Sequence, residues 1–290
     1  MMFLVLSLLT SSAIFLLFKW FGLNNVNTFQ AIVVNYIVAC SLGVFLTAGK
    51  IDYSSLTTNP AFRNGALLGI LFIGLFFLMA LISQKMGAGI SSTATKLSLV
   101  IPTLFFIMLN PSESWTWLKI IALLISIPGV ILTIYQPSNK AAISLFLPFI
   151  LFFGSGLLDI VLAYTEQEFA HSDLDKIILT SSAFLTSGII GIIYLSVAKQ
   201  NSLKFTSKSI KNGIALGLIN FGSIYFLLKT YEKMSLDKSQ IIPINNLGIV
   251  VLSSLLAYIF MKERLNNYNK SGLLISILSI LLLVLDSFLK

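Results

Sequence analysis

The chain has 290 residues, of which 57% are hydrophobic and only 10% charged, and its mean hydropathy is +0.94. Soluble domains are nearer about one quarter charged, so nineteen basic and eleven acidic residues are too few to cover a soluble globule of this length. The net charge of +8 does not indicate a nucleic-acid partner, because the basic residues lie singly between apolar runs, as loop charges do in membrane proteins. The lipid bilayer is therefore predicted to surround most of the surface.

Ten apolar segments are long enough to cross a membrane, since a spanning helix needs about 20 mostly apolar residues. In chain order they are Met2–Phe21, Thr28–Ala48, Phe62–Ser83, Ser91–Leu109, Trp115–Tyr135, Ile143–Tyr164, Ile177–Ala198, Ile210–Lys229, Ser239–Met261 and Lys270–Phe288. They are about twice as long as transmembrane strands and do not alternate in polarity. We expect an all-α membrane protein with ten transmembrane helices, the first of them retained because no basic region or cleavage site marks a signal peptide.

Four prolines fall inside these segments, at Pro102, Pro128, Pro148 and Pro243. Neighbouring groups in a membrane protein can satisfy the carbonyl that a proline frees, so proline is tolerated there and usually leaves a kink. Each kink serves either packing or function, and the sequence leaves both interpretations open.

The chain contains an internal repeat. Arg63–Met86 aligns without a gap on Lys211–Met234, and the alignment matches one asparagine, three glycines and a terminal Lys-Met pair: Asn64 with Asn212, Gly65, Gly69 and Gly74 with Gly213, Gly217 and Gly222, and Lys85–Met86 with Lys233–Met234. Small residues at such spacing let helix backbones approach closely, and tight packing of these two segments is the favoured interpretation.

The repeat continues downstream, where Glu113 follows the fourth segment as Glu263 follows the ninth. Residues 1–138 are thus predicted to form one five-helix unit and residues 139–290 a second. Because five is odd, the second copy enters the membrane from the opposite side. Inverted repeats of this kind are common in secondary transporters, whose substrate site lies near the midplane between the copies.

With these features the sequence resembles the drug/metabolite transporter superfamily, specifically its ten-helix EamA-type members, over essentially the whole chain. The resemblance depends on the two five-helix halves and on the glutamate after helices four and nine: Met261–Lys262–Glu263–Arg264–Leu265 leads to Gly272, and Glu113–Ser114–Trp115 leads toward Gly129. The first copy departs from the family pattern, because Asn110–Pro111–Ser112 replaces an apolar residue and a glycine before the glutamate.

The family implies transport of small metabolites, often export of amino acids or related compounds, through a central cavity without a metal or organic cofactor. It also implies a coupling ion, a proton or sodium, or a counter-substrate. The sequence does not specify the substrate, the direction, the ion or the oligomeric state.

Charged side chains inside a span cost about 2.5–3.5 kcal/mol on insertion scales, so each is a candidate for a functional site. Lys96 lies within the fourth segment beside Thr95 and Ser98. It is either a cavity lysine that attracts an anionic group or a lysine that snorkels to the interface. Asp159 lies late in the sixth segment and either carries a proton or sits at the interface. Their depths place Lys96 and Asp159 in different leaflets.

Uncharged amides complete the predicted substrate-binding set. Asn245 and Asn246 follow Pro243, and under the repeat they fall opposite Leu97–Ser98, next to Lys96. Amides at this depth bind either a substrate or a neighbouring helix. Asn220 is a further candidate, with Asn35 and Ser223 weaker. The full set of predicted substrate-binding residues is Lys96, Asn245, Asn246, Asp159, Ser98 and Asn220.

Catalytic and metal sites are not predicted. His171 is the single histidine and Cys40 the single cysteine, and no H-E-x-x-H motif or acidic pair for magnesium is present. The acidic stretch Glu166–Asp175 is expected to be a solvated loop. A channel or a non-transporting scaffold competes with the carrier interpretation, and a membrane-embedded enzyme is a weaker alternative.

The family resemblance and the loop charges predict opposite orientations in the membrane. The family resemblance implies an inner-membrane protein with both termini in the cytoplasm. The positive-inside rule counts loop lysine and arginine residues. It mildly favours the opposite orientation, with ten on the side away from the termini and eight on the other. We expect cytoplasmic termini.

Overall fold

The computed structural model describes residues 1–50, 56–109, 116–134, 146–197, 204–236, 238–262 and 266–288, and every regular element in these ranges is helical. This confirms the predicted all-α class for the described part of the chain. The α-helices are α1 Met2–Leu23, α2 Thr28–Leu46, α3 Pro60–Met86, α4 Ala88–Lys96, α5 Val100–Leu109, α6 Trp117–Ile134, α7 Phe146–Phe169, α8 Asp173–Val197, α9 Ser207–Lys233, α10 Lys238–Met261 and α11 Asn267–Phe288.

Within these ranges eight helices are long and apolar enough to cross a membrane: α1, α2, α3, the α4–α5 pair taken as one span, α7, α8, α9 and α10. The apolar parts of α6 and α11 that qualify are shorter, Trp117–Gly129 and Lys270–Ser279. Many large apolar side chains face outward on the spans, Phe45, Phe153 and Tyr194 among them. A soluble protein rarely exposes apolar area on this scale, so the surface suits a bilayer.

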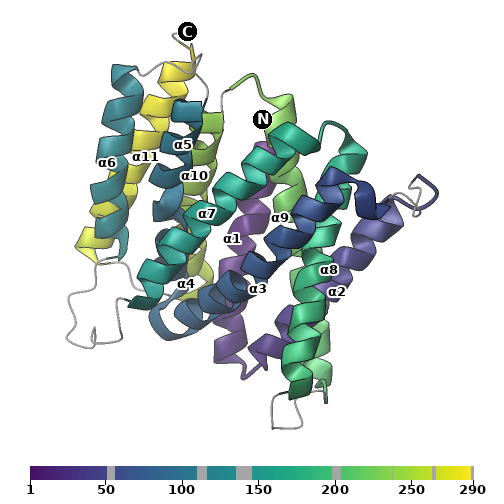
Figure 1. Cartoon of the computed structure of the whole chain (residues 1–290). Coiled ribbons are helices and arrows are strands. Elements are labelled where there is room, and N and C mark those ends of the chain that lie inside the picture. Colours follow the sequence, from purple (N-terminus) through teal and green to yellow (C-terminus); the bar gives the residue numbers. More distant parts are fainter. Residues whose placement is uncertain are drawn as a thin grey trace.

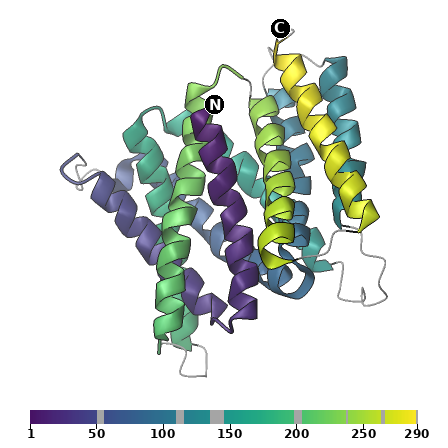
Figure 2. The ribbon, with the colours of Figure 1, turned by 180° about the vertical axis from the view of Figure 1, so that it is seen from behind.

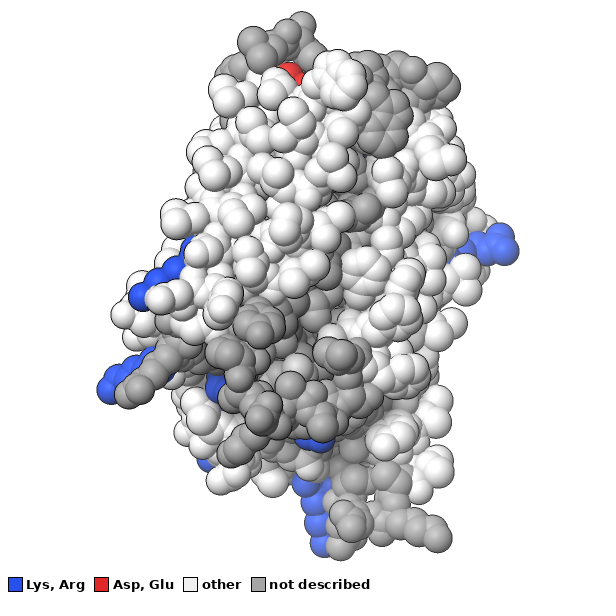
Figure 3. Space-filling model, turned by 90° about the vertical axis from the view of Figure 1, so that its left-hand side faces the viewer, with Lys and Arg blue, Asp and Glu red and all other residues white. Residues whose placement is uncertain are grey.

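Figure 3 shows one face of this surface. Lysine and arginine side chains gather in its lower part and at its edges, and above them an extensive area carries no basic residue and a single acidic patch near the top. An uncharged band bordered by basic side chains is typical of a surface that lies against lipid.

Local signals explain where several helices begin. The Asn27 side chain accepts a hydrogen bond from the Gln30 amide at the start of α2, and the Thr206 hydroxyl does the same for Ser209 at the start of α9. Asn59 caps α3, and Pro60 follows at the first helical position, where its missing N–H costs nothing. These side chains satisfy amide groups that a helix terminus leaves without partners.

The fourth span is discontinuous. Helix α4 ends at Lys96, a 3₁₀ turn covers Leu97–Leu99 (η2), and α5 starts at Val100. Pro102 gives the physical reason, because it has no N–H to donate to the Ser98 carbonyl and its ring crowds that carbonyl. The predicted proline kink therefore appears as a break beside Lys96. Pro128 and Pro243 lie inside α6 and α10 without ending them.

The helices form two groups joined by α1 and α7. Figures 1 and 2 show α5, α6, α10 and α11 on one side of the molecule and α2, α3, α8 and α9 on the other. Between them α1 packs on α9 and α10, and α7 packs on α3, α4 and α5. Both termini lie toward the same end of the bundle, as do the α7–α8 and α9–α10 connections (Figure 1). We call this the terminal end.

The repeated glycines lie where helices touch most closely. A Cβ atom at Gly65 would lie 2.3 Å from the Leu179 carbonyl oxygen, and one at Gly69 would lie 2.4 Å from the Ala183 oxygen, both in α8. In the second copy, Gly213 and Gly217 meet carbonyl oxygens of α2 at 2.7 and 2.8 Å. Helix α3 thus packs on α8 and α9 packs on α2, each through its first two repeat glycines. Both repeat segments are therefore tightly packed, as expected, but on α8 and α2 rather than on each other.

The expectation of a solvated loop over Glu166–Asp175 is wrong. Helix α7 continues through Glu166 to Phe169, and α8 begins at Asp173. The Ser172 hydroxyl accepts a hydrogen bond from the Asp175 amide, and the Asp175 carboxylate accepts one back from Ser172, which starts α8 early. The acidic residues therefore lie at two helix ends.

The glycine contacts predict opposite outcomes for two neighbouring substitutions. Gly69→Ala should lower stability by about 1–3 kcal/mol, because its methyl group would meet backbone that cannot move aside cheaply. Gly74→Ala should leave stability unchanged, because a Cβ atom there meets nothing within 4 Å. Thermal unfolding of the detergent-solubilised variants measures both, and equal melting temperatures for the two variants would contradict the packing role.

Candidate substrate cavity

A cavity of about 800 Å³, a volume that includes the open solvent at its mouth, lies between α1, α3, α4, α7, α9 and α10, and Tyr36 of α2 also lines it. Three helices line it with residues at positions i, i+3, i+4 and i+7, which is one face of an α-helix. These stripes are Phe72, Leu75, Phe76 and Met79 in α3, Ser155, Leu158, Asp159 and Leu162 in α7, and Asn220, Ser223, Ile224 and Leu227 in α9. Helix α1 adds Ser11, Ile14 and Phe15 at the same spacing.

Lys96 contributes the cationic group of the cavity. It is the last residue of α4, at the break caused by the 3₁₀ turn, and it is partly buried. Among the described residues its ammonium group makes no hydrogen bond or ion pair. A membrane-depth lysine without a protein partner has to be hydrated or bound to something else.

Asp159 contributes the carboxylate. It is 9% exposed, and its Oδ2 atom accepts a hydrogen bond from Asn246 Nδ2 at 3.1 Å. The bond joins α7 to α10 at the cavity wall. The Asp159 carboxylate thus lines the cavity while a neutral amide holds it in place.

Two further amides pair across helices. Asn245 Oδ1 accepts a hydrogen bond from the Ser7 hydroxyl at 3.1 Å, and Asn220 Nδ2 donates to Asn35 Oδ1 at 3.1 Å. These bonds connect α10 to α1 and α9 to α2. Both Asn245 and Asn220 still line the cavity, so each serves helix packing and contributes amide atoms to the wall.

The structure brings most of the predicted site residues together. Lys96, Asp159, Asn220 and Asn245 line one cavity, so the two charged side chains share one space. Asn246 lies just behind the wall and reaches it through Asp159.

Ser98 does not line the cavity. It is fully buried, and its hydroxyl donates to the Thr95 carbonyl oxygen at 2.6 Å within the same helical turn.

Sequence reasoning missed the aromatic wall and two small polar residues. Phe15, Phe72 and Phe76 form an apolar side of the cavity, and Ser11 and Ser155 face it from α1 and α7. The spacing of polar residues in the sequence could have indicated the two serines. Ser155 and Asp159 lie four residues apart on one helical face, and so do Ser7 and Ser11. Serine is common in membrane helices, however, so the spacing alone is weak.

The cavity combines one ammonium group, one carboxylate and several amides with an apolar aromatic wall. Small-molecule sites commonly have this composition. In the described part of the chain, no group of three or more histidine, cysteine or acidic side chains is arranged to hold a metal ion.

Thiol labelling should separate Lys96 from its neighbour. In a Cys40→Ser background, Lys96→Cys should react with a membrane-impermeant maleimide from one side of the membrane, because position 96 lines the cavity. Ser98→Cys is the matched control and should not react, because position 98 is fully buried away from the cavity. If Lys96→Cys did not react from either side of the membrane, position 96 would not face a water-filled site.

Comparison with known proteins gives similarity over nearly the full length of the chain. No protein-family model matches it. An uncharacterized protein of Haemophilus influenzae (strain ATCC 51907 / DSM 11121 / KW20 / Rd) is 25% identical over 288 residues, which cover 96% of this chain and 95% of that protein. A solved crystal structure of a protein superposes with a TM-score of 0.72 at 13% identity, covering 98% of this chain and 96% of that chain. At that identity the likeness extends to the fold alone.

Proposed function

We propose that this protein is a secondary transporter that moves small metabolites through the central cavity by alternating access. The observation that supports it most strongly is the position of Lys96. An ammonium group without a protein partner, at a helix break inside a cavity, suits the binding of an anionic or zwitterionic solute. Discontinuous helices at membrane depth are a recurring device of transporter sites.

The proposal includes ten spans arranged as two inverted repeats. Helix packing supports it, because contacts recur when each helix is exchanged for its counterpart in the other half, with α4 and α5 taken as one span. The pair α3–α8 corresponds to α9–α2, α1–α9 to α7–α3, and α1–α10 to α7–α4. Helices α6 and α11, which would be the fifth and tenth spans, pack on each other. The cavity is then lined by helices from both halves, as the transporter architecture requires.

We further propose that the protein is an EamA-type member of the drug/metabolite transporter superfamily, located in the inner membrane with cytoplasmic termini. The fit of two five-helix halves supports this assignment. The glutamates of the family pattern, Glu113 and Glu263, lie outside the described residues, as does the 138/139 boundary between the predicted repeat units. Gly129 and Gly272 lie in α6 and α11. Amino acids or related compounds are the proposed substrate class, and export is the proposed direction.

Coupling to an ion gradient would involve Asp159. Its carboxylate and the Lys96 ammonium group line the same cavity, so a substrate and a proton or sodium ion could compete for one site. Exchange of a counter-substrate would use the cavity without a coupled ion. A channel is the second candidate function, but the closed aromatic packing of α1 against α3 favours a carrier.

Transport by the reconstituted protein should be saturable and should show counter-flow, which a channel does not. A screen of labelled metabolites in proteoliposomes identifies the substrate. Lys96→Ala should then reduce transport about tenfold or more, because losing a charge contact of moderate strength lowers substrate affinity by about that factor. Lys96→Arg should not restore full activity, because the guanidinium is larger and forked.

Lys85→Ala is the matched control for these variants, because Lys85 is exposed at the end of α3 and does not line the cavity. Unchanged transport in Lys96→Ala would exclude this lysine from the site, and flux without counter-flow would favour the channel.

Topology reporters test the proposed orientation. A fusion at Lys290 should report the cytoplasm and a fusion at Lys204 the opposite side, because α8 and α9 connect away from the terminal end (Figure 1). A periplasmic signal at Lys290 would show that the excess of loop lysines determines the orientation.

A further inference from the structure

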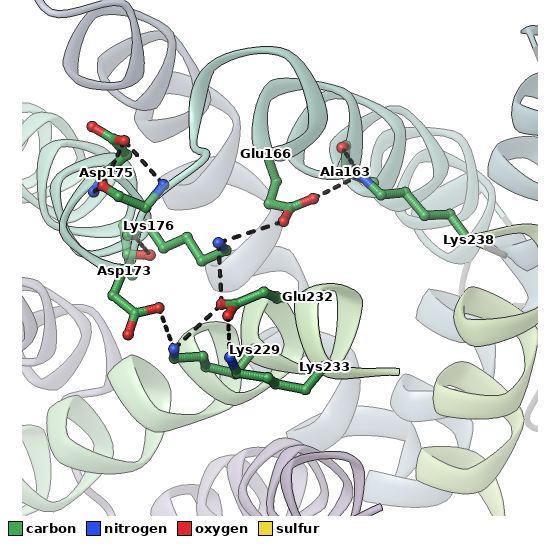
Figure 4. A network of polar contacts seen from close by, with 11 residues as sticks. Ala163, Glu166, Asp173, Asp175, Lys176, Lys229, Glu232, Lys233 and Lys238 are labelled. Carbon is green, nitrogen blue, oxygen red and sulfur yellow. Dashed lines mark hydrogen bonds and ion pairs between the residues drawn. The ribbon is translucent and has the colours of Figure 1, made fainter. Parts of the chain in front are cut away.

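A cluster of charged side chains joins four helices at the terminal end (Figure 4). Its members come from α7, α8, α9 and α10, and we call them the ion-pair cluster: Glu166, Asp173, Lys176, Lys229, Glu232, Lys233 and Lys238. None of them lines the cavity. The cluster is therefore separate from the proposed substrate site.

Glu166 occupies the centre of the cluster. Its Oε2 atom accepts a hydrogen bond from Lys238 Nζ at 2.6 Å, and its Oε1 atom lies 3.9 Å from Lys176 Nζ. Lys238 also donates to the Ala163 carbonyl oxygen at 2.7 Å, one turn earlier in α7. One carboxylate thus connects α7 to both α8 and α10.

The cluster continues from Lys176 to α9. Lys176 Nζ lies 3.3 Å from Glu232 Oε2, and the same oxygen is 3.3 Å from Lys229 Nζ. Lys229 also pairs with Asp173 at the start of α8. A continuous chain of charges therefore runs from α10 through α7 and α8 to α9.

Stability alone does not explain this arrangement. The side chains of Lys176 and Glu166 are only 2% and 9% exposed, so both charges have lost most of their hydration. Apolar residues of similar volume are often as stabilising as a buried ion pair or more so. A buried pair does, however, fix one arrangement of the helices that carry it, because removing either partner leaves a charge without compensation.

The cluster lies directly beyond the cavity. Leu162 and Leu227 line the cavity from α7 and α9, and each is followed four residues later, about 6 Å along the helix, by Glu166 and Tyr231. The ring of Tyr231 lies beneath the Lys238 ammonium group, 5.3 Å from its centre. Charged side chains thus stand between the cavity and the terminal end.

Backbone packing differs between the two ends of the cavity. Helix α1 packs on α3 and α4, and the Ser83 hydroxyl donates to the Phe15 carbonyl oxygen at 3.0 Å while the Phe18 and Phe76 rings lie 4.9 Å apart. In the described part of the chain, α7 makes no comparably extensive contact with α9 or α10. At the terminal end α7 and α10 are connected by the long Glu166 and Lys238 side chains and by a small apolar cluster of Ala163 and Ile242 with Phe106 of α5.

We propose that the ion-pair cluster is the gate of the cavity at the terminal end, with the Glu166–Lys238 pair as its latch. The proposal rests on the proposed transport function. Opening separates α7 from α10, and the freed carboxylate and ammonium groups are then hydrated by the water that enters. The opposite end closes through apolar packing, so the two gates respond to different chemistry.

Labelling of a cavity cysteine tests the gate without any substrate. Ser155→Cys in a Cys40→Ser background places a thiol on the cavity wall. Glu166→Gln and Lys238→Gln should each raise its rate of reaction with an impermeant maleimide from the terminal side by about tenfold, a common size for coupling between paired charges. The double variant should match the single variants, because both break the same pair.

Glu168→Gln is the matched control, since Glu168 is an exposed carboxylate two residues away in α7 and outside the cluster. Its labelling rate should equal that of the parent. Unchanged rates in folded Glu166→Gln and Lys238→Gln proteins would overturn the gate, and so would equal increases from both sides, which would indicate a loosened fold. Glu232→Gln provides the same test from α9 if the Glu166 variant does not accumulate.

The outcome is distinguishable from failure of the proposed function. A protein without measurable transport could still show one-sided changes in labelling, and a genuine carrier could show none.

Discussion

A polar side chain inside a helix bundle surrounded by lipid has to find its partner within the protein, because the hydrocarbon offers none. The described structure follows this constraint closely. Asn35 pairs with Asn220, Ser7 with Asn245, and Ser92 with Ser253, each bond joining two helices that are far apart in the sequence. Such bonds add only modestly to stability, but they define which helix faces which. Lys96 has no such partner in the described part of the chain, and this contrast supports the proposed role of the cavity in binding a solute.

The same constraint gives the glycines their role. Lipid provides no hydrophobic force that drives helices together, so close van der Waals contact has to do so. Gly65 and Gly69 bring α3 onto α8, and Gly213 and Gly217 bring α9 onto α2. These contacts hold the scaffold on one side of the cavity, and they position the aromatic stripe of α3 and the Asn220 stripe of α9. Tight packing and the site are therefore parts of one arrangement.

The helical class and most of the spans could be predicted from hydropathy, because about 20 consecutive apolar residues leave few alternatives to a spanning helix. The presence of polar or charged residues inside predicted spans likewise indicated Lys96, Asp159, Asn220 and Asn245, which the structure brings to one cavity. That Lys96 and Asp159 line the same cavity could not be predicted, since Lys96 ends a broken helix whose geometry depends on Pro102. Ser98 was wrongly placed at the wall because a serine hydroxyl can bond its own helix backbone, as it does here.

Glu166 shows where hydropathy fails most clearly. Its acidic neighbourhood is typical of a solvated loop, yet the carboxylate is buried, and only partners distant in sequence, Lys176 and Lys238, make that burial tolerable. The offset that aligns Met86 with Met234 matches Glu232 with Gln84 and Lys238 with Ile90. Gln84 is neutral and Ile90 is buried and apolar. In the proposed repeat, these two positions are charged at the terminal end of the cavity and uncharged at the other, whereas Lys233 and its counterpart Lys85 are both charged. A repeat whose two copies match in their glycines but differ at these positions would keep the scaffold common to both proposed halves while giving the two proposed entrances different chemistry.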